Sequence, residues 1–228
     1  NLGEDTDTTA AVTGGLAGLL YGFDDIPQTW VKQISRHDDI VNLSKRLNLE
    51  IEKKTNTDIQ TLYQQTIKFA AEHHGNQKIP GSEIPYVVHL SNVCMEILFA
   101  ATQTKFNLQL AVQVALLHDV LEDTPTTETE LEKTFGHDVL VCVKALTKNE
   151  SLPKAEQMRD SLRRIKQAPK EAWAVKLGDR ITNLQPPPKH WTTEKINQYR
   201  EEAKVIYEEL KDGNLYLANR LKAAIDKY

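Results

Sequence analysis

Apolar residues recur at helical spacing along most of the chain. Between Thr57 and Gly75 they lie at every third or fourth position, which predicts a helix that begins at Thr57 or Asp58. The apolar face of this helix ends at His74, which we interpret as a hydrogen-bonded buried histidine. Further helices are expected at 90–102, 108–121, 128–135, 137–147, 154–167, 171–184, 193–211 and 215–227. We find no alternating strand pattern and no internal repeat, so the sequence predicts an all-α fold.

Residues 1–48 form a separate first block. A helix of small residues is expected at 10–21, and Pro27 opens a second helix, because proline is favoured at the first helical position. Residues 49–57 are polar and charged, which is typical of a linker. The sequence therefore predicts a short N-terminal helical appendage at 1–48, a linker at 49–57 and a main domain at 58–228.

Composition narrows the class of protein. The 228 residues are 40% hydrophobic and 26% charged, as in an ordinary globular protein. A net charge of −4 argues against a broad nucleic-acid interface, although it permits a small phosphorylated ligand. No apolar run is long enough to cross a bilayer and no signal peptide is recognised, so no membrane partner is expected. Cys94 and Cys142 lie in apolar segments, which predicts reduced core residues in a cytoplasmic protein. The sequence carries no signature of an oligomeric state.

The segment from Leu108 to Leu121 is almost wholly apolar, as in a buried helix. It carries the pair His118-Asp119, and the pair Glu122-Asp123 follows one turn later. Burying imidazole and carboxylate groups is costly unless they are satisfied, and a metal ion satisfies both ligand types. Adjacent residues on a helix point about 100° apart, so His118 and Asp119 can reach one ion only at a bend or with angled side chains.

Two further polar residues adjoin apolar helices. His89 stands where the helix at 90–102 begins, so it either caps that helix or points toward the central one. Asp179 lies in an apolar segment with Asn183 one turn later, which is the same signal as at Asp119. The alternative for Asp179 is a structural ion pair with Lys176 or Arg180.

The first block resembles the C-terminal end of ADP-ribosylglycohydrolases, through Gly-Glu-Asp-Thr-Asp-Thr at 3–8, Gly-Gly-Leu-Ala-Gly-Leu-Leu-Tyr-Gly at 14–22 and Ile-Pro-Gln-Thr-Trp at 26–30. That resemblance implies Asp5, Asp7 and Thr8 as ligands of a magnesium pair. The residues alone also permit helix capping by the two aspartates. The family's other ligands belong to an N-terminal motif that this chain lacks. We therefore expect Mg²⁺ there only if the missing half is supplied, and no ADP-ribosyl hydrolysis.

A second and larger resemblance covers about residues 62–219. Its motifs are Pro-Tyr-Val-Val-His at 85–89, Ala-Leu-Leu-His-Asp-Val-Leu-Glu-Asp-Thr at 115–124, Phe-Gly at 135–136, Leu-Thr-Lys at 146–148 and Val-Lys-Leu-Gly-Asp-Arg-Ile-Thr-Asn-Leu at 175–184. In this order they resemble the HD-superfamily hydrolase domain of RelA/SpoT-type enzymes, which hydrolyse the stringent-response alarmone (p)ppGpp. The implied fold is an HD-domain helical bundle around a single metal ion, usually Mn²⁺.

The resemblance also implies roles for individual residues. The implied metal ligands are His89, His118, Asp119 and Asp179. Glu122 and Asp123 would handle the attacking water, and Asn183 would contact the ribose-phosphate region. A cation held by two histidines and two aspartates keeps open positions and activates water, which Glu122 or Asp123 can deprotonate. The predicted substrate is a small nucleotide, and the predicted reaction releases its 3′-pyrophosphate.

Three cationic side chains are candidate substrate contacts, namely Lys176, Arg180 and Lys78. The sequence departs from the family pattern beside Lys78, where Ile79 and Pro80 replace a basic pair, and at Pro186, where a threonine is common. The base-recognition surface is therefore altered while the metal motifs are intact. Two alternatives remain, namely hydrolysis of another phosphorylated nucleotide and a non-catalytic module that senses one. Glu122 and Asp123 favour an enzyme, and the absence of synthetase motifs predicts hydrolysis without synthesis.

Overall fold

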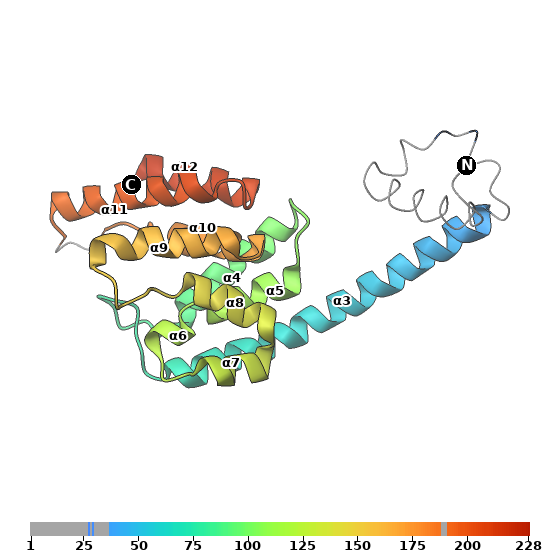
Figure 1. The fold of residues 1–228 in the computed structure, drawn as a ribbon, viewed down its shortest axis with the longest axis horizontal. Coiled ribbons are helices and arrows are strands. Elements are labelled where there is room, and N and C mark those ends of the chain that lie inside the picture. The colour runs from blue at the N-terminus through green and yellow to red at the C-terminus, as the bar shows by residue number, and fades with distance from the viewer. Residues whose placement is uncertain (1–26, 28, 30–36, 188–190) are drawn as a thin grey trace, which may run out of the picture. The chain divides into compact units, whose positions relative to one another are not determined.

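The computed structural model describes residues 27, 29, 37–187 and 191–228, and for residues 37 and 48–58 it describes the backbone alone. Over these residues the chain forms ten helices, α3 to α12, and no strand, which confirms the all-α prediction (Figure 1). The chain divides into two compact units, residues 1–56 and 57–228. The helices expected at 10–21 and after Pro27, and the candidate ligands Asp5, Asp7 and Thr8, lie outside the described residues.

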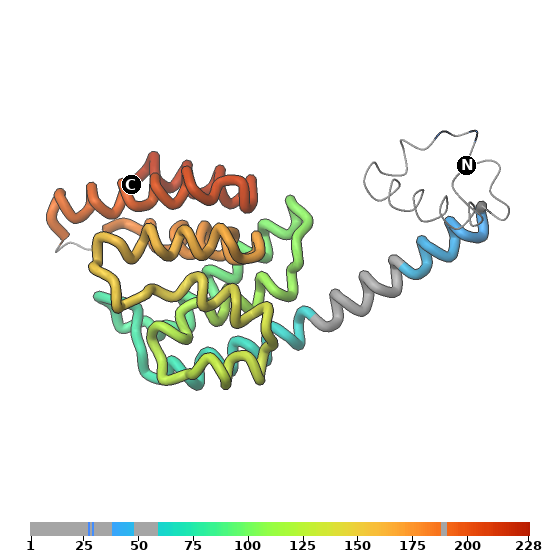
Figure 2. The backbone as a smooth tube through the Cα atoms, in the orientation of Figure 1, coloured from blue at the N-terminus to red at the C-terminus, as the bar shows by residue number. Residues whose placement is uncertain are grey.

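Helix α3 runs from His37 to His74, so the predicted start at Thr57 or Asp58 is wrong (Figure 2). Residues 49–57, predicted as a linker, are helical. No glycine or proline occurs between His37 and His74, and residues 49–54 include leucine, glutamate and lysine, which favour helix. The helix ends where Gly75 adopts a positive φ of 53°. Polarity alone therefore did not mark a helix boundary.

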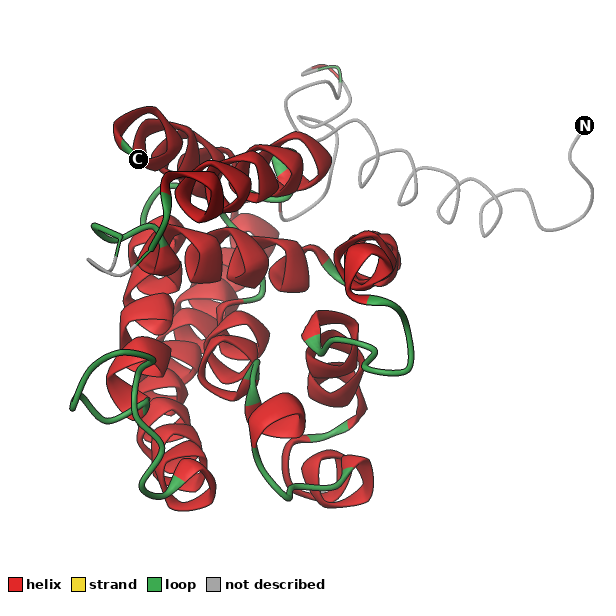
Figure 3. Ribbon diagram, turned by 90° about the vertical axis from the view of Figure 1, so that its left-hand side faces the viewer, coloured by secondary structure: helices red, strands yellow, loops and turns green. Residues whose placement is uncertain are grey.

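The second unit is organised around helix α10, Lys170–Asn183, which is buried on most of its sides. It packs against α4 and α5 on one side and against α11 and α12 on the other (Figure 1). Figure 3 shows the described residues from a second direction as helices joined by loops. The remaining bounds are α4 Val87–Ala101, α5 Leu108–Leu117, α6 Val120–Asp123, α7 Glu128–Phe135, α8 His137–Leu146, α9 Lys154–Gln167, α11 Thr193–Leu210 and α12 Leu215–Lys227.

Glycine and proline residues set several of these bounds. Pro153 and Pro169 directly precede α9 and α10, and Gly136, with a φ of 90°, separates α7 from α8. At Gly213, between α11 and α12, an added Cβ would lie 2.6 Å from the Cβ of Trp173, so this turn requires glycine. In the part of the chain that the structure describes, no helix is both long and apolar enough to cross a membrane.

The helix expected at 108–121 is interrupted near its C-terminal end. Helix α5 ends at Leu117 and α6 begins at Val120, and between them Asp119 has φ −104° and ψ 0°. The prediction of one continuous helix is therefore wrong. The interruption does provide the bend that allows the side chains of His118 and Asp119 to reach one ion. The apolar pattern gave no sign of the interruption because it continues through Val120 and Leu121.

Candidate metal centre and catalytic pair

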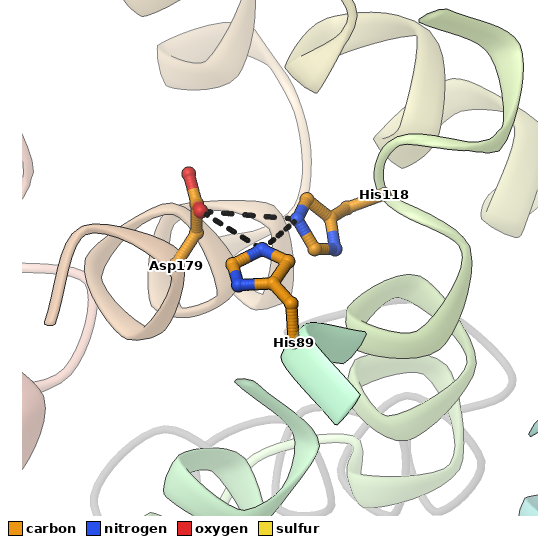
Figure 4. Close-up of side chains that lie close together, drawn as sticks. All are labelled: His89, His118 and Asp179. Atoms are coloured by element: carbon orange, nitrogen blue, oxygen red, sulfur yellow. Dashed lines mark hydrogen bonds and ion pairs between the residues drawn. The ribbon is translucent and has the colours of Figure 1, made fainter. Parts of the chain in front are cut away.

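Three buried side chains from different parts of the chain lie close together (Figure 4). They are His89 of α4, His118 directly after α5, and Asp179 of α10. The Nε2 atoms of His89 and His118 are 3.4 Å apart. The Oδ1 atom of Asp179 lies 3.5 Å from Nε2 of His89 and 3.8 Å from Nε2 of His118. Ligand atoms at about 2 Å from one ion lie roughly 3 to 4 Å from one another, so these three atoms fit a shared ion.

Asp119 joins this group from the interruption between α5 and α6. Its Oδ2 lies 3.0 Å from Nε2 of His118 and 3.9 Å from Nε2 of His89. The structure thus brings together the four residues that the sequence singled out as metal ligands. We refer to His89, His118, Asp119 and Asp179 as the ligand cluster.

The hydrogen bonds of His118 orient it as a metal ligand requires. Its Nδ1 donates to the carbonyl oxygen of Ala115 at 2.8 Å, which leaves the lone pair of Nε2 directed into the ligand cluster. Two imidazole nitrogens and two carboxylates form a donor set that suits a divalent cation. The residues present therefore fit a divalent metal ion.

The carboxylates of the ligand cluster are supported from outside it. Tyr86 donates its hydroxyl to Oδ2 of Asp119, and burial together with that carboxylate raises the pKa of Tyr86 far above its ordinary value. Lys176 Nζ lies 3.0 Å from Oδ2 of Asp179, and Asn183 Nδ2 donates to Oδ1 of Asp179 at 2.5 Å. Hydrogen bonds of this kind fix the orientation of ligating carboxylates.

Charges within the ligand cluster shift its pKa values. Burial disfavours the imidazolium form of His118, but Asp119 and Asp179 outweigh burial and raise the pKa of His118 to about 9. Burial also opposes ionisation of Asp179, yet Lys176 and the two histidines hold its pKa well below the usual range. Without a cation, a proton therefore occupies the position that a metal would take.

Glu122 and Asp123, which the sequence predicts as the catalytic pair, lie on α6 directly after Asp119. Oε1 of Glu122 is 2.5 Å from Nζ of Lys148, and its Oε2 accepts the backbone N–H of Lys148 at 3.0 Å. Burial opposes the ammonium group, but the hydrogen bond and charge of Glu122 raise the pKa of Lys148. Asp123 is exposed, and its Oδ2 accepts a hydrogen bond from Nε2 of Gln77 at 2.9 Å.

The cationic substrate candidates have different surroundings. Lys176 and Asn183 both contact Asp179 of the ligand cluster. Of the two ion pairs considered for Asp179, the structure forms the one with Lys176. Arg180 is buried against α11, with its guanidinium 4.3 Å from the ring centroid of Tyr199 and 3.8 Å from a carboxylate oxygen of Glu202. Lys78 forms an ion pair with Glu83 in its own loop.

Three residues that contact the site were not predicted from the sequence, namely Tyr86, Gln77 and Lys148. Tyr86 and Lys148 lie inside motifs recognised at 85–89 and 146–148, which was a usable signal. Gln77 lies in a polar loop without helical periodicity, and only the fold brings it to Asp123.

Comparisons with known proteins agree with this geometry. The HD domain family matches residues 66–221, and the ADP-ribosylglycohydrolase family matches residues 1–57. The guanosine-3′,5′-bis(diphosphate) 3′-pyrophosphohydrolase MESH1 of Danio rerio is 34% identical over 163 residues, covering 69% of this chain and 89% of that protein. MESH1 of Homo sapiens is 33% identical over 159 residues, covering 68% and 87%.

Solved structures show the same relationship. The structure described as a metazoan ortholog of SpoT that hydrolyses ppGpp superimposes with a TM-score of 0.65 and 31% identity. The superposition covers 73% of this chain and 94% of that one. A protein of Listeria monocytogenes shares the fold, with a TM-score of 0.53 and 21% identity over 65% of this chain and 97% of that one. The chain belongs to the HD domain family, in the group that contains the MESH1 guanosine-3′,5′-bis(diphosphate) 3′-pyrophosphohydrolases.

Proposed function

We propose that this protein is a metal-dependent hydrolase that releases pyrophosphate from the 3′ position of ppGpp and pppGpp. The observation that carries the proposal is the ligand cluster with Glu122 and Asp123 beside it, in a chain that spans 89% of a relative named for this reaction. The proposed ligands of the ion are His89, His118, Asp119 and Asp179. We propose Mn²⁺ as the ion because the resemblance to HD-superfamily hydrolases implies it, and the two carboxylate ligands suit it.

The protein's own residues supply the remaining chemistry. When bound, a divalent cation withdraws charge from a phosphate oxygen and acidifies the attacking water. The water oxygen forms a bond to the 3′ phosphorus as the bond to the ribose 3′ oxygen breaks. Glu122 or Asp123 accepts the water's proton, and Lys176 is proposed to offset pyrophosphate charge. The other candidate, Arg180, is buried against α11 and is not placed for this role. The carboxylic acid or solvent returns a proton to the ribose 3′ oxygen, so the products are GDP or GTP and pyrophosphate. Asn183 is proposed to orient the ribose-phosphate region.

The loop that precedes Pro85 supports a second candidate substrate class. Ile79 and Pro80 carry no charge, and the ammonium group of Lys78 is paired with Glu83. A base-recognition loop without a free cation favours a broader choice of base. The same centre would then hydrolyse another phosphorylated nucleotide.

Two reduced, buried cysteines, Cys94 and Cys142, fit the proposed cytoplasmic location.

Incubation of the purified protein with Mn²⁺ and ppGpp tests the proposal. We expect GDP and pyrophosphate in equal amounts, separated by ion-exchange chromatography, and no turnover after chelation. Turnover of other nucleotides without turnover of ppGpp would support the second substrate class. Binding of nucleotides without turnover of any of them would identify a sensing module.

A further inference from the structure

His74 is a buried histidine that the ligand cluster does not use. It lies in the last turn of α3, its exposed fraction is 6%, and within the described residues its Nε2 has no hydrogen-bond partner. Its Nδ1 lies 2.6 Å from Oε1 of Gln77. A buried imidazole costs free energy unless it makes a compensating interaction, so its single polar contact is informative.

Gln77 connects this histidine to the catalytic pair. While its Oε1 faces His74, its Nε2 donates to Oδ2 of Asp123 at 2.9 Å. Its backbone is fixed as well, because its N–H donates to the carbonyl of His74 at 2.9 Å and its carbonyl accepts from the N–H of Tyr86 at 2.9 Å. The side chain of Gln77 therefore bridges a buried residue and an exposed carboxylate.

The chemistry of the amide fixes its direction. If the amide of Gln77 were reversed, its oxygen would face the carboxylate of Asp123, where neither group can donate. The observed direction requires that His74 carry its proton on Nδ1, because Oε1 of Gln77 can only accept. With the proton on Nδ1, neutral His74 has no donor at the unpartnered Nε2. A histidine in this tautomer thus selects the donating orientation of Gln77.

The two carboxylates of the catalytic pair are held differently. Both oxygens of Glu122 are engaged by Lys148, at 2.5 Å and 3.0 Å. In the part of the chain that the structure describes, Asp123 has a partner at Oδ2 alone, which leaves Oδ1 available. A general base needs an oxygen that can reach the water, so Asp123 is better placed for proton transfer than Glu122.

We propose that His74 and Gln77 form a positioning relay that holds Oδ2 of Asp123 and presents its Oδ1 to the attacking water. Asp123 is then the general base, and Gln77 acts through it. The inference rests on the proposed function, since it assigns roles within the same site. His74 also packs on Tyr86, with ring centroids 4.9 Å apart, so changes at His74 reach Asp119 as well. Gln77 is therefore the cleaner position for a test.

A double-mutant cycle tests the relay. We expect Gln77→Leu to lower kcat about 10-fold to 100-fold, with KM and Mn²⁺ affinity within about twofold of the parent. In an Asp123→Asn background the same change should cost less than about twofold, because the carboxylate it positions is gone. Gln65→Leu is the matched control, since Gln65 is an exposed glutamine of α3 with no side-chain hydrogen bond in the described structure. That control should keep full activity.

A second measurement needs neither substrate nor metal. Nitrogen-15 NMR of labelled, metal-free protein should show His74 as the neutral tautomer protonated at Nδ1. Protonation at Nε2 alone, or an equal loss from Gln77→Leu in both backgrounds, would overturn the relay. An active parent whose Gln77→Leu variant keeps its kcat would do the same while leaving the proposed function intact. An inactive parent with the Nδ1 tautomer would instead contradict the proposed function and the role of Asp123 as a base.

Discussion

The floor and the rim of the site are built from different kinds of structure. The floor is the ligand cluster, in which His89, His118 and Asp179 have side chains no more than 10% exposed and are held by α4, α5 and α10. The rim carries the catalytic pair on α6, a helix of four residues, and its partners Gln77 and Lys148 come from loops. Packed helices fix geometry firmly, whereas short exposed elements adjust easily. Metal retention and turnover should therefore respond to different substitutions.

The largest effect is expected at the floor. Asp119→Ala removes a proposed ligand and leaves Tyr86 without its acceptor, so we expect loss of bound Mn²⁺ and a fall in turnover of at least about a thousandfold. Metal analysis after gel filtration and initial rates with ppGpp measure the two losses. Circular dichroism should show a folded protein, and a variant that retained metal and activity would contradict the ligand assignment.

The rim should separate chemistry from metal binding. Asp123→Asn keeps the shape of the side chain but removes the carboxylate proposed as the general base, so we expect kcat to fall about 100-fold to 10,000-fold while one equivalent of Mn²⁺ remains bound. Rapid-quench kinetics and metal analysis on the same sample provide the measurement. A fall in metal content together with kcat would contradict the separation of metal binding at the floor from chemistry at the rim.

An intermediate effect is expected from the tyrosine that supports the floor. Tyr86→Phe removes the hydroxyl that binds Asp119, and we expect Mn²⁺ affinity to weaken about 10-fold to 100-fold. Saturating Mn²⁺ should restore most of kcat. Tyr63→Phe is the matched control, because the hydroxyl of Tyr63 lies 3.3 Å from Oγ of Ser91 in another part of the fold. An equal loss in both variants would indicate general destabilisation.

The pH dependence of metal binding should report on His118. Because its pKa in the metal-free protein is about 9, Mn²⁺ must displace a proton at neutral pH. We expect the apparent affinity to rise with pH by at most about tenfold per unit and to level off above about pH 9. Titration calorimetry in buffers of different ionisation enthalpy should also detect the released proton. An affinity independent of pH would contradict this assignment.

The same raised pKa has a consequence for stability. The pKa of His118 in the folded, metal-free protein exceeds the ordinary histidine value of about 6.5. Protonated His118 therefore contributes its full stabilisation of the fold below about pH 6.5. This contribution to metal-free protein is lost as the pH rises through about 9. Urea unfolding with chelator present should therefore show a free energy of unfolding that falls between about pH 6.5 and pH 9. Added Mn²⁺ should offset this fall.

The smallest effect is expected at the outer edge of the rim. The side chain of Lys148 is 56% exposed, so solvent weakens its ion pair with Glu122. We expect Lys148→Met to lower kcat about threefold to tenfold, since the backbone N–H of residue 148 still binds Glu122. Lys144→Met is the control, because Lys144 forms an ion pair of similar exposure with Glu128. A loss as large as that of Asp123→Asn would make the lysine essential.

Much of this architecture could be predicted because helices and a metal centre leave local signals. Apolar periodicity predicted most of the helices from α4 onward, and polar residues within apolar segments singled out His118, Asp119 and Asp179 as candidates for a metal site. Local signals failed where distant contacts decide the outcome. The break at His118 and Asp119 lies inside an apolar pattern that continues. Gln77 contacts Asp123 only through the tertiary fold, because the two residues are 46 positions apart in the sequence. Helix propensity, which outweighs polarity at residues 49–57, accounts for the missed start of α3.

The interruption at Asp119 also affects how this scaffold could acquire a new reaction. Because α6 begins directly after Asp119 and has only four residues, the two predicted proton acceptors, Glu122 and Asp123, lie in one short segment next to a predicted metal ligand. Val120 is buried in this segment and Leu121 packs against the core, so the interior of the protein constrains both. Directed evolution of the proton-transfer step would therefore search two contiguous codons, whereas a new substrate specificity would also involve Lys176 and Asn183 on α10.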